Sequence, residues 1–282
     1  MSLIATFSQF ESPFSHDGMT HKVYWKRARG SNESSPAVLL MHELPGMTES
    51  CLKFANRLVD NGFTVYLPLL FGKAGESDAI AAVVANSLIY TAQICISKEF
   101  NALKEKQSSP ITNWLRALCR QIYSLPEHQS FRGIGAIGMC LTGGFVLSLM
   151  IDESVMAPVA SQPSLPFGLT DSQKKALGIS PNELAIAKSR AKQTGLLALR
   201  FEEDRICPPE RFDTLRREFG DSIECKIISA QERKRDDIRP SPHAIFTLDF
   251  ADRQGNPHPC TQEALERLIE FLRQRLLSIF SL

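Results

Sequence analysis

Residues 138–144 read Gly-Met-Cys-Leu-Thr-Gly-Gly and join one short apolar run to a second apolar run. This layout is typical of a nucleophile elbow, a sharp strand-to-helix turn that holds one reactive side chain above a sheet. The residue at the apex is Cys140, and the sequence contains no Gly-x-Ser-x-Gly motif that competes with it. We therefore predict that Cys140 is a nucleophile, and that amides at the start of the following helix favour its thiolate form.

The residues that flank the apex must be small, because the backbone of such a turn is strained and leaves little space. Gly138 meets this need two residues before Cys140. Two residues after Cys140 stands Thr142, and the glycines follow one place later at Gly143 and Gly144. We interpret Thr142 as a departure from the motif that weakens the match.

Two other interpretations of this stretch compete with the elbow. Most free cysteines are small buried apolar residues, and this chain has seven cysteines. Gly133, Gly135 and Gly138 also spell the Gly-x-Gly-x-x-Gly pattern of dinucleotide-binding sites. The residues before Gly133 do not read as an apolar strand, and the next acidic residues come too soon for a ribose-binding acid, about 20 residues on. We interpret these glycines as part of a strand that leads into the elbow.

The overall composition is that of a soluble globular protein, with 43% hydrophobic and 22% charged residues among 282. We expect a single domain over residues 1–282, as a monomer or homodimer. A net charge of +1 does not point to nucleic acid, and neither a signal peptide nor an apolar run of membrane-spanning length is recognisable. The cysteines form no zinc-type spacing, so we expect free thiols in the cytoplasm and neither a metal nor another cofactor.

Strand and helix patterns alternate along the chain. Ala37–Met41 is a continuous apolar run, Thr48 can cap a helix of apolar periodicity, and residues 63–67 form another apolar run. This rhythm predicts a mostly parallel, doubly wound sheet flanked by helices. Residues 72–130 read as a helical excursion between two strands, either a partial cap or ordinary crossover helices.

The last part of the chain yields two further predictions. The charged segment 231–240 reads as a solvated surface loop. Residues 261–279 carry apolar residues at helical spacing and predict a final helix.

A catalytic cysteine needs a base and an acid that orients the base. Asp204 follows the strand predicted over residues 195–201, and His243 follows the strand predicted over residues 223–229, so the order of nucleophile, acid and histidine is present. Each assignment has an alternative. Asp204 could be an acid at the start of the next helix, Glu202 and Glu203 are rivals for its role, and His243 could be an ordinary loop histidine.

A carboxylate is also expected beside the predicted nucleophile. Glu43 follows His42 in the loop after the strand Ala37–Met41, and in a doubly wound sheet this loop faces the nucleophile. The pair is not a zinc motif, because no second histidine follows at the required spacing. A carboxylate at this place would oppose a resting thiolate, unless it accepts the thiol proton itself.

Four segments in this order resemble the dienelactone hydrolase family of α/β-hydrolases. They are His-Glu-Leu-Pro-Gly-Met at 42–47, Gly-Met-Cys-Leu-Thr-Gly-Gly at 138–144, Arg-Phe-Glu-Glu-Asp-Arg-Ile-Cys-Pro at 200–208 and Ser-Pro-His-Ala at 241–244. The resemblance runs from about the first buried strand to the end of the chain. It implies the α/β-hydrolase fold and the opening of an enol-lactone or an activated ester.

The resemblance also implies roles for individual residues. The nucleophile would be Cys140, the base His243 and the orienting acid Asp204. Glu43 would hold the cysteine in a guarded resting state until substrate displaces it. The backbone amides of Leu44 and Leu141 would form the oxyanion hole.

The arginines that hold a dienelactone's carboxylate cannot be placed by motif. Arg200, Arg205 and Lys73 are candidates for this role.

We therefore expect a hydrolase of activated carboxylic esters or lactones that acts through an acyl-enzyme, similar to a carboxymethylenebutenolidase. Its partner would be a small-molecule substrate, without nucleic acid or membrane. The alternative is a non-catalytic or thiol-sensing binding protein on the same fold, because a fold does not fix a function. The departure at Thr142 motivates this alternative.

Overall fold

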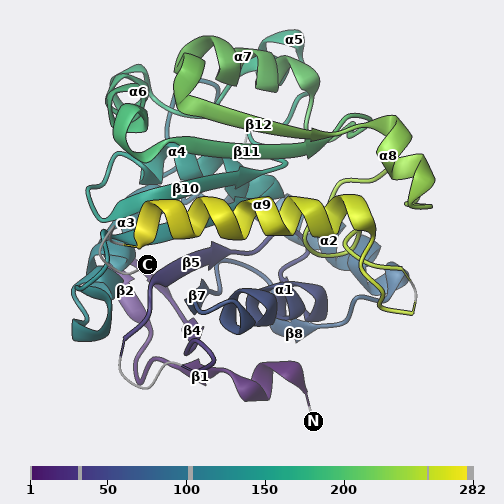
Figure 1. The fold of residues 1–282 in the computed structure, drawn as a ribbon. Coiled ribbons are helices and arrows are strands. Elements are labelled where there is room, and N and C mark those ends of the chain that lie inside the picture. Colours follow the sequence, from purple (N-terminus) through teal and green to yellow (C-terminus); the bar gives the residue numbers. More distant parts are fainter. Residues whose placement is uncertain (1, 31–33, 101–103, 253, 278–282) are drawn as a thin grey trace.

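An eight-stranded sheet lies at the centre of the protein (Figure 1). The computed structural model describes residues 2–30, 34–100, 104–252 and 254–277. The five pairs from β7 to β12 are parallel, whereas β1 and β4 are antiparallel to their neighbours. In spatial order the strands are β1 (Ser8–Gln9), β4 (Val23–Lys26), β7 (Thr64–Pro68), β5 (Ala37–Met41), β9 (Ile134–Met139), β10 (Val155–Ser161), β11 (Leu196–Phe201) and β12 (Ile223–Ile228).

Two short two-stranded sheets lie beside the main sheet. One pairs β2 (Phe14–His16) with β3 (Met19–His21) in antiparallel orientation, and the other pairs β6 (Met47–Thr48) with β8 (Ala74–Glu76) in parallel.

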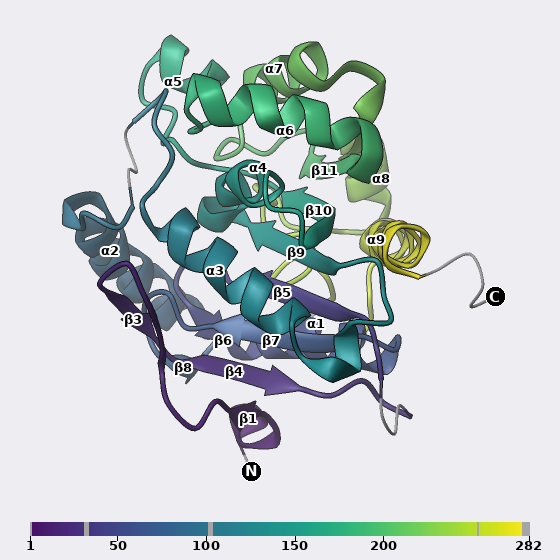
Figure 2. The same cartoon turned by 90° about the vertical axis from the view of Figure 1, so that its left-hand side faces the viewer.

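Helices cover both faces of the main sheet. In Figure 1, α1 (Glu49–Asp60) and α9 (Pro259–Leu276) lie in front of the strands. On the opposite face lie α3 (Ile111–Tyr123), α4 (Phe145–Leu149), α6 (Pro181–Thr194) and α7 (Pro209–Phe219), and Figure 2 shows α3 and α4 on the side away from α9. The remaining described helices are α2 (Ile80–Ile96), α5 (Asp171–Lys175), α8 (Ala230–Arg235), and the 3-10 turns η1 (Leu3–Thr6), η2 (Pro126–His128), η3 (Cys140–Gly144) and η4 (Gly220–Ser222).

The alternation of side chains along β5 explains why its sequence is apolar throughout. Leu39 packs into the core with α3 and α4, whereas Val38 and Leu40 pack into the core with α1 and α9. Successive side chains of a strand point to opposite faces, so a strand covered on both faces has no position for a polar residue. The predicted mostly parallel, doubly wound sheet is confirmed.

The helical excursion predicted at residues 72–130 contains α2 and α3, with residues 101–103 outside the described part. Helix α3 is a crossover helix, because its side chains are buried against the sheet, among them Trp114 and Leu118. This leaves α2 as the part of the excursion to which the proposal of a cap still applies. No helix in the described ranges combines the length and apolarity needed to cross a membrane.

Two predictions near the end of the chain need correction. The segment 231–240 is not wholly a loop, since Ser229 caps α8 in a capping box with Glu232, a signal that the sequence carries. The final helix begins at Pro259 rather than 261, because proline is well accommodated in the first turn of a helix. Its predicted end at residue 279 lies outside the described residues.

Candidate active site

Cys140 lies at a sharp turn between β9 and η3. Its backbone φ of +53° is in the left-handed region, which residues other than glycine rarely adopt, and its side chain is almost buried. Such strain is typical of a nucleophile elbow. The helix predicted to follow Cys140 instead begins as the 3-10 turn η3, and α4 follows from Phe145.

Thr142 fits the turn because its side chain bonds within it. The Thr142 hydroxyl accepts a hydrogen bond from the Met139 amide (2.9 Å) and lies 3.1 Å from the carbonyl oxygen of Met41, at the end of β5. The small residue that the turn requires is one place later, because a Cβ on Gly143 would lie 2.8 Å from Pro163 Cα. The departure from the motif is therefore accommodated, and Thr142 ties the elbow to the neighbouring strand.

We expect Gly138→Ala to lower the free energy of unfolding by about 3 kcal/mol, through overpacking in a closed turn. A Cβ at this position would lie 2.3 Å from the Thr142 carbonyl oxygen, which is backbone and cannot rotate away. Urea unfolding measures the effect. The matched control is Gly135→Ala on the same strand, where the added Cβ meets the flexible end of Leu272 at 2.9 Å. Equal losses in both variants would contradict the argument.

His243 is held by Asp204. The Nδ1 atom of His243 lies 2.7 Å from the Asp204 carboxylate, which is buried. The other Asp204 oxygen accepts hydrogen bonds from the amides of Ile206 and Cys207, at 2.9 and 3.0 Å. Asp204 thus contacts both the histidine and the backbone that leads into α7, although the N-cap residue of α7 is Pro208.

The two rival acids face elsewhere. Glu202 accepts a hydrogen bond from the Ala230 amide, and Glu203 forms an ion pair with Arg233. Both are exposed. The geometry therefore selects Asp204 as the acid beside His243.

The loop that carries His243 is fixed by a second buried carboxylate. Asp249 accepts hydrogen bonds from the backbone amides of His243 and Ala244, each at 2.8 Å, and pairs with Arg239. Because two amides and a guanidinium meet one carboxylate, the backbone at His243 has little freedom to move.

Glu43 lies in the loop after β5 and is 5% exposed. The Thr247 hydroxyl donates to one oxygen of its carboxylate, and the Gln162 amide donates to the other at 3.1 Å. Burial raises the pKa of Glu43, while the positive charge of His243 and these two hydrogen bonds act in the opposite direction. Gln162 has a φ of +35°, so its backbone is strained at the position that presents the amide.

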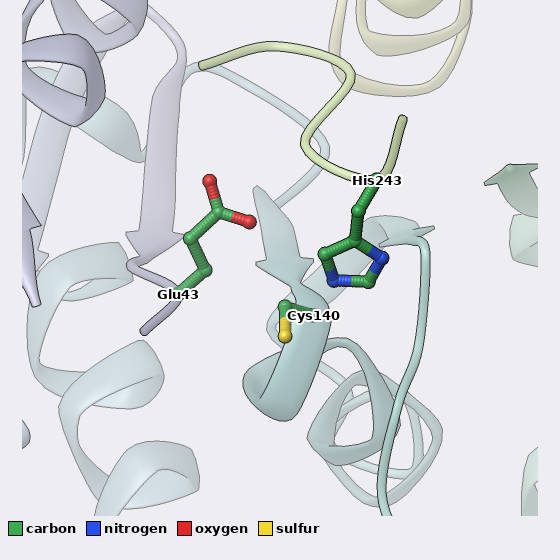
Figure 3. Close-up of side chains that lie close together, drawn as sticks. All are labelled: Glu43, Cys140 and His243. Atoms are coloured by element: carbon green, nitrogen blue, oxygen red, sulfur yellow. The ribbon is translucent and has the colours of Figure 1, made fainter. Parts of the chain in front are cut away.

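Glu43, Cys140 and His243 converge from three separate segments (Figure 3). The Glu43 carboxylate, the Cys140 sulfur and a nitrogen of His243 all lie within 4.8 Å of one another. Burial lowers the pKa of His243, but the negative charges of Cys140 and Asp204 outweigh it and raise the pKa well above its usual value. The raised pKa favours a protonated imidazole beside the Cys140 sulfur and the Asp204 carboxylate.

His42 is structural. It is fully buried, its Nε2 accepts a hydrogen bond from the Leu70 amide at 3.1 Å, and burial lowers its pKa to about 4. His42 is thus neutral and ties the Glu43 loop to the segment after β7.

The oxyanion residues expected from the sequence occupy the segments that flank Cys140. Leu44 follows Glu43 in the loop after β5, and Leu141 is the second residue of η3. The role of their amides as oxyanion donors stays a proposal.

Arg200 cannot hold a substrate carboxylate. Its buried guanidinium donates to the backbone carbonyls of Glu202, Asp204 and Cys207, and so supports the loop that carries Asp204. Arg205 and Lys73 are exposed, and their candidacy remains open.

Sequence reasoning missed three residues that position the site, namely Gln162, Thr247 and Asp249. The sequence does carry a signal for Gln162. It is a polar residue directly after a buried parallel strand, and the carboxyl ends of such strands form the edge of the sheet where ligands bind. No sequence pattern marks Thr247 or Asp249, since short polar residues are common in irregular loops.

The fold and the arrangement of the site define an α/β-hydrolase. Solved structures with this fold include a dienelactone hydrolase from Anabaena variabilis, with a TM-score of 0.56, 13% identity and coverage of 96% of this chain and 100% of that one. Another is a dienelactone hydrolase-like promiscuous phosphotriesterase from metagenomic libraries, with a TM-score of 0.60, 14% identity and coverage of 96% and 100%.

The sequence comparison gives the family. The model of the dienelactone hydrolase family matches residues 24–231, so the chain belongs to this family of hydrolases. The chain is also 22% identical over 283 aligned residues to a Saccharomyces cerevisiae protein named "Putative carboxymethylenebutenolidase", with coverage of 98% of this chain and 93% of the relative.

Proposed function

We propose that this protein hydrolyses activated carboxylic esters or lactones through a thioester intermediate on Cys140. The observation that carries the proposal is the orientation of His243. One ring nitrogen is 2.7 Å from the Asp204 carboxylate, so the other is left for the cluster that contains the Cys140 sulfur. A base oriented by an acid beside a strained nucleophile is the arrangement that acyl transfer needs.

In the acylation step, the Cys140 thiol gives its proton to His243 and the sulfur bonds to the substrate carbonyl carbon. The backbone amides of Leu44 and Leu141 donate hydrogen bonds to the oxyanion that forms. The carbon–oxygen bond to the leaving alkoxide then breaks, and the alkoxide takes the proton from His243. With a lactone, the alcohol stays attached to the acyl group.

In the deacylation step, water is the nucleophile and the Cys140 sulfur is the leaving group. A water molecule gives a proton to His243 and attacks the thioester carbonyl. The carbon–sulfur bond breaks, the carboxylic acid leaves, and Cys140 recovers its proton. One water is consumed for each ester bond that is cleaved.

Glu43 would guard the nucleophile in the resting enzyme. Its carboxylate lies within 4.8 Å of the Cys140 sulfur, and two hydrogen bonds hold it there. A carboxylate at this place opposes a thiolate by charge repulsion. A substrate that displaces it would release the sulfur for attack.

We expect a labelled acyl group from p-nitrophenyl acetate to appear on Cys140 when the reaction is quenched within the first turnover. Peptide mass spectrometry locates the acetyl group, and protein alkylated beforehand at Cys140 is the control. Acetylation elsewhere with none on Cys140, in an enzyme that turns the ester over, would contradict the proposal.

The alternative of a non-catalytic or thiol-sensing binding protein had Thr142 as its motive. Because the Thr142 hydroxyl bonds within the elbow, this residue no longer favours that alternative. Absence of any ester hydrolysis would restore it.

A further inference from the structure

The side chains of the candidate site present three different donor atoms to one small space. These are a carboxylate oxygen of Glu43, the sulfur of Cys140 and a ring nitrogen of His243, all within 4.8 Å of one another (Figure 3). Each donor comes from a separate loop, and all three loops are fixed by buried hydrogen bonds. The space is therefore assembled by the tertiary structure.

This donor set matches the chemistry of zinc. Zn²⁺ binds thiolate, imidazole and carboxylate at about 2.0–2.3 Å, and sites with three protein ligands leave one position open. Hard cations such as Mg²⁺ and Ca²⁺ prefer oxygen ligands alone. The three donor atoms must approach by about 1 Å to reach tetrahedral spacing. A change of the Cys140 rotamer moves the sulfur by more than that.

The state of His243 is a second, independent observation. Its buried Nε2 makes no hydrogen bond of ordinary geometry with any described residue, although His243 interacts electrostatically with Cys140. Its Nδ1 is bound to Asp204 at 2.7 Å. In zinc sites, a carboxylate on one ring nitrogen fixes the tautomer and aims the lone pair of the other nitrogen at the metal. A buried ring nitrogen that Asp204 orients toward a thiol and a carboxylate can bind a metal ion when it gives up its proton.

The Glu43 carboxylate also keeps capacity for a ligand. Thr247 and Gln162 each donate one hydrogen bond to it. An ionised carboxylate has about four lone-pair sites, so two remain. The same two hydrogen bonds fix its orientation toward the cluster.

We propose that Glu43, Cys140 and His243 bind one Zn²⁺ ion, and that this ion reversibly inhibits the enzyme. Binding forms zinc–sulfur and zinc–Nε2 bonds and releases to solvent the one proton that Cys140 and His243 share, so that Cys140 is a thiolate and His243 is neutral in the complex. No oxidation occurs, so a chelator that removes the ion restores the thiol. The inhibitory part rests on the proposed function, whereas the binding part does not.

The test uses the full chain after treatment with a chelator. Titration calorimetry with zinc sulfate should give one bound ion, and Mg²⁺ at the same concentration should give none. Co²⁺ in place of Zn²⁺ should produce the sulfur-to-cobalt charge-transfer band of a thiolate ligand. Wild-type protein alkylated at Cys140 should lose this band, and this comparison needs no substitution that could impair folding.

Substitutions then assign the ligands. Cys140→Ala and His243→Ala should each weaken zinc binding at least about 100-fold, and Asp204→Asn about 10- to 100-fold, as expected for a residue that orients a ligand. Cys225→Ser, which alters a partly buried thiol of β12, is the matched control and should bind as the wild type does. Thermal unfolding of each variant shows whether it is folded.

The outcomes separate the two proposals. Zinc binding that is lost with Cys140, together with chelator-reversible inhibition of ester hydrolysis, supports the inference. The same binding in a protein without ester hydrolysis supports the site and overturns the proposed function. Absence of stoichiometric binding, or binding that is unchanged after alkylation of Cys140, overturns the inference.

Discussion

Cys140→Ala should reduce kcat for an activated ester by about four orders of magnitude or more, because the variant has no atom that can form the acyl-enzyme. Removal of the catalytic nucleophile of a hydrolase lowers kcat by about this factor. The rate that remains comes from the oxyanion donors and from substrate binding. The variant should fold, since Cys140 is nearly buried and alanine fills most of its space without new contacts. Stopped-flow release of p-nitrophenol from p-nitrophenyl acetate measures the rate.

Two further variants show whether the lower kcat of Cys140→Ala is due to the loss of the nucleophile. Cys140→Ser keeps the shape of the side chain and a weaker nucleophile, so it should lie between the wild type and Cys140→Ala. Cys225→Ser should hydrolyse the ester at the wild-type rate, because β12 does not contribute to the cluster. If Cys140→Ala kept more than a tenth of the activity, the thioester mechanism would be wrong.

Asp204→Asn should lower kcat by about four orders of magnitude, the size of loss that the equivalent acid-to-amide change causes in serine proteases. The reason lies in the second oxygen of Asp204, which accepts from the amides of Ile206 and Cys207. These amides require an oxygen there, so the asparagine must turn its NH₂ group toward His243. Nδ1 then becomes the acceptor, and the proton moves to the nitrogen that should act as the base.

The control for this prediction is Glu202→Gln. Glu202 belongs to the same loop, but it is exposed and bonds to the Ala230 amide, so the rate should not change. The measurement is kcat for the same ester, with thermal unfolding to verify that the Asp204→Asn loop is intact. An Asp204→Asn enzyme within tenfold of the wild type would remove Asp204 from the mechanism.

The elements that could be predicted from the sequence are those with strong local patterns. The apolar run of β5 gave the observed bounds, Ala37–Met41, and the alternation of strand and helix patterns gave the mostly parallel sheet. The pattern of apolar residues lies within the sequence of the element itself, so it can be recognised without knowledge of the rest of the fold. The segment that became α8 was misjudged because its charges suggested a loop, while its capping box was overlooked.

The elbow shows the limit of motif reasoning. Thr142 was interpreted as a defect because the motif asks for a small residue at that position. The structure places the close approach at Gly143 and gives the Thr142 hydroxyl two backbone partners. Which of two adjacent residues must be small depends on the neighbouring strand and loop, and these are distant in sequence.

The sequence alone determined the chain order of Cys140, Asp204 and His243, since each follows a recognisable strand of a parallel sheet. Tertiary structure alone decided what surrounds them. Gln162 and Thr247 reach Glu43 across 119 and 204 residues of sequence. Such contacts depend on loops that pack at one edge of the sheet. Loop conformation is set by many weak interactions that no local pattern encodes, so the cluster of Glu43, Cys140 and His243 became visible only once the loops were placed.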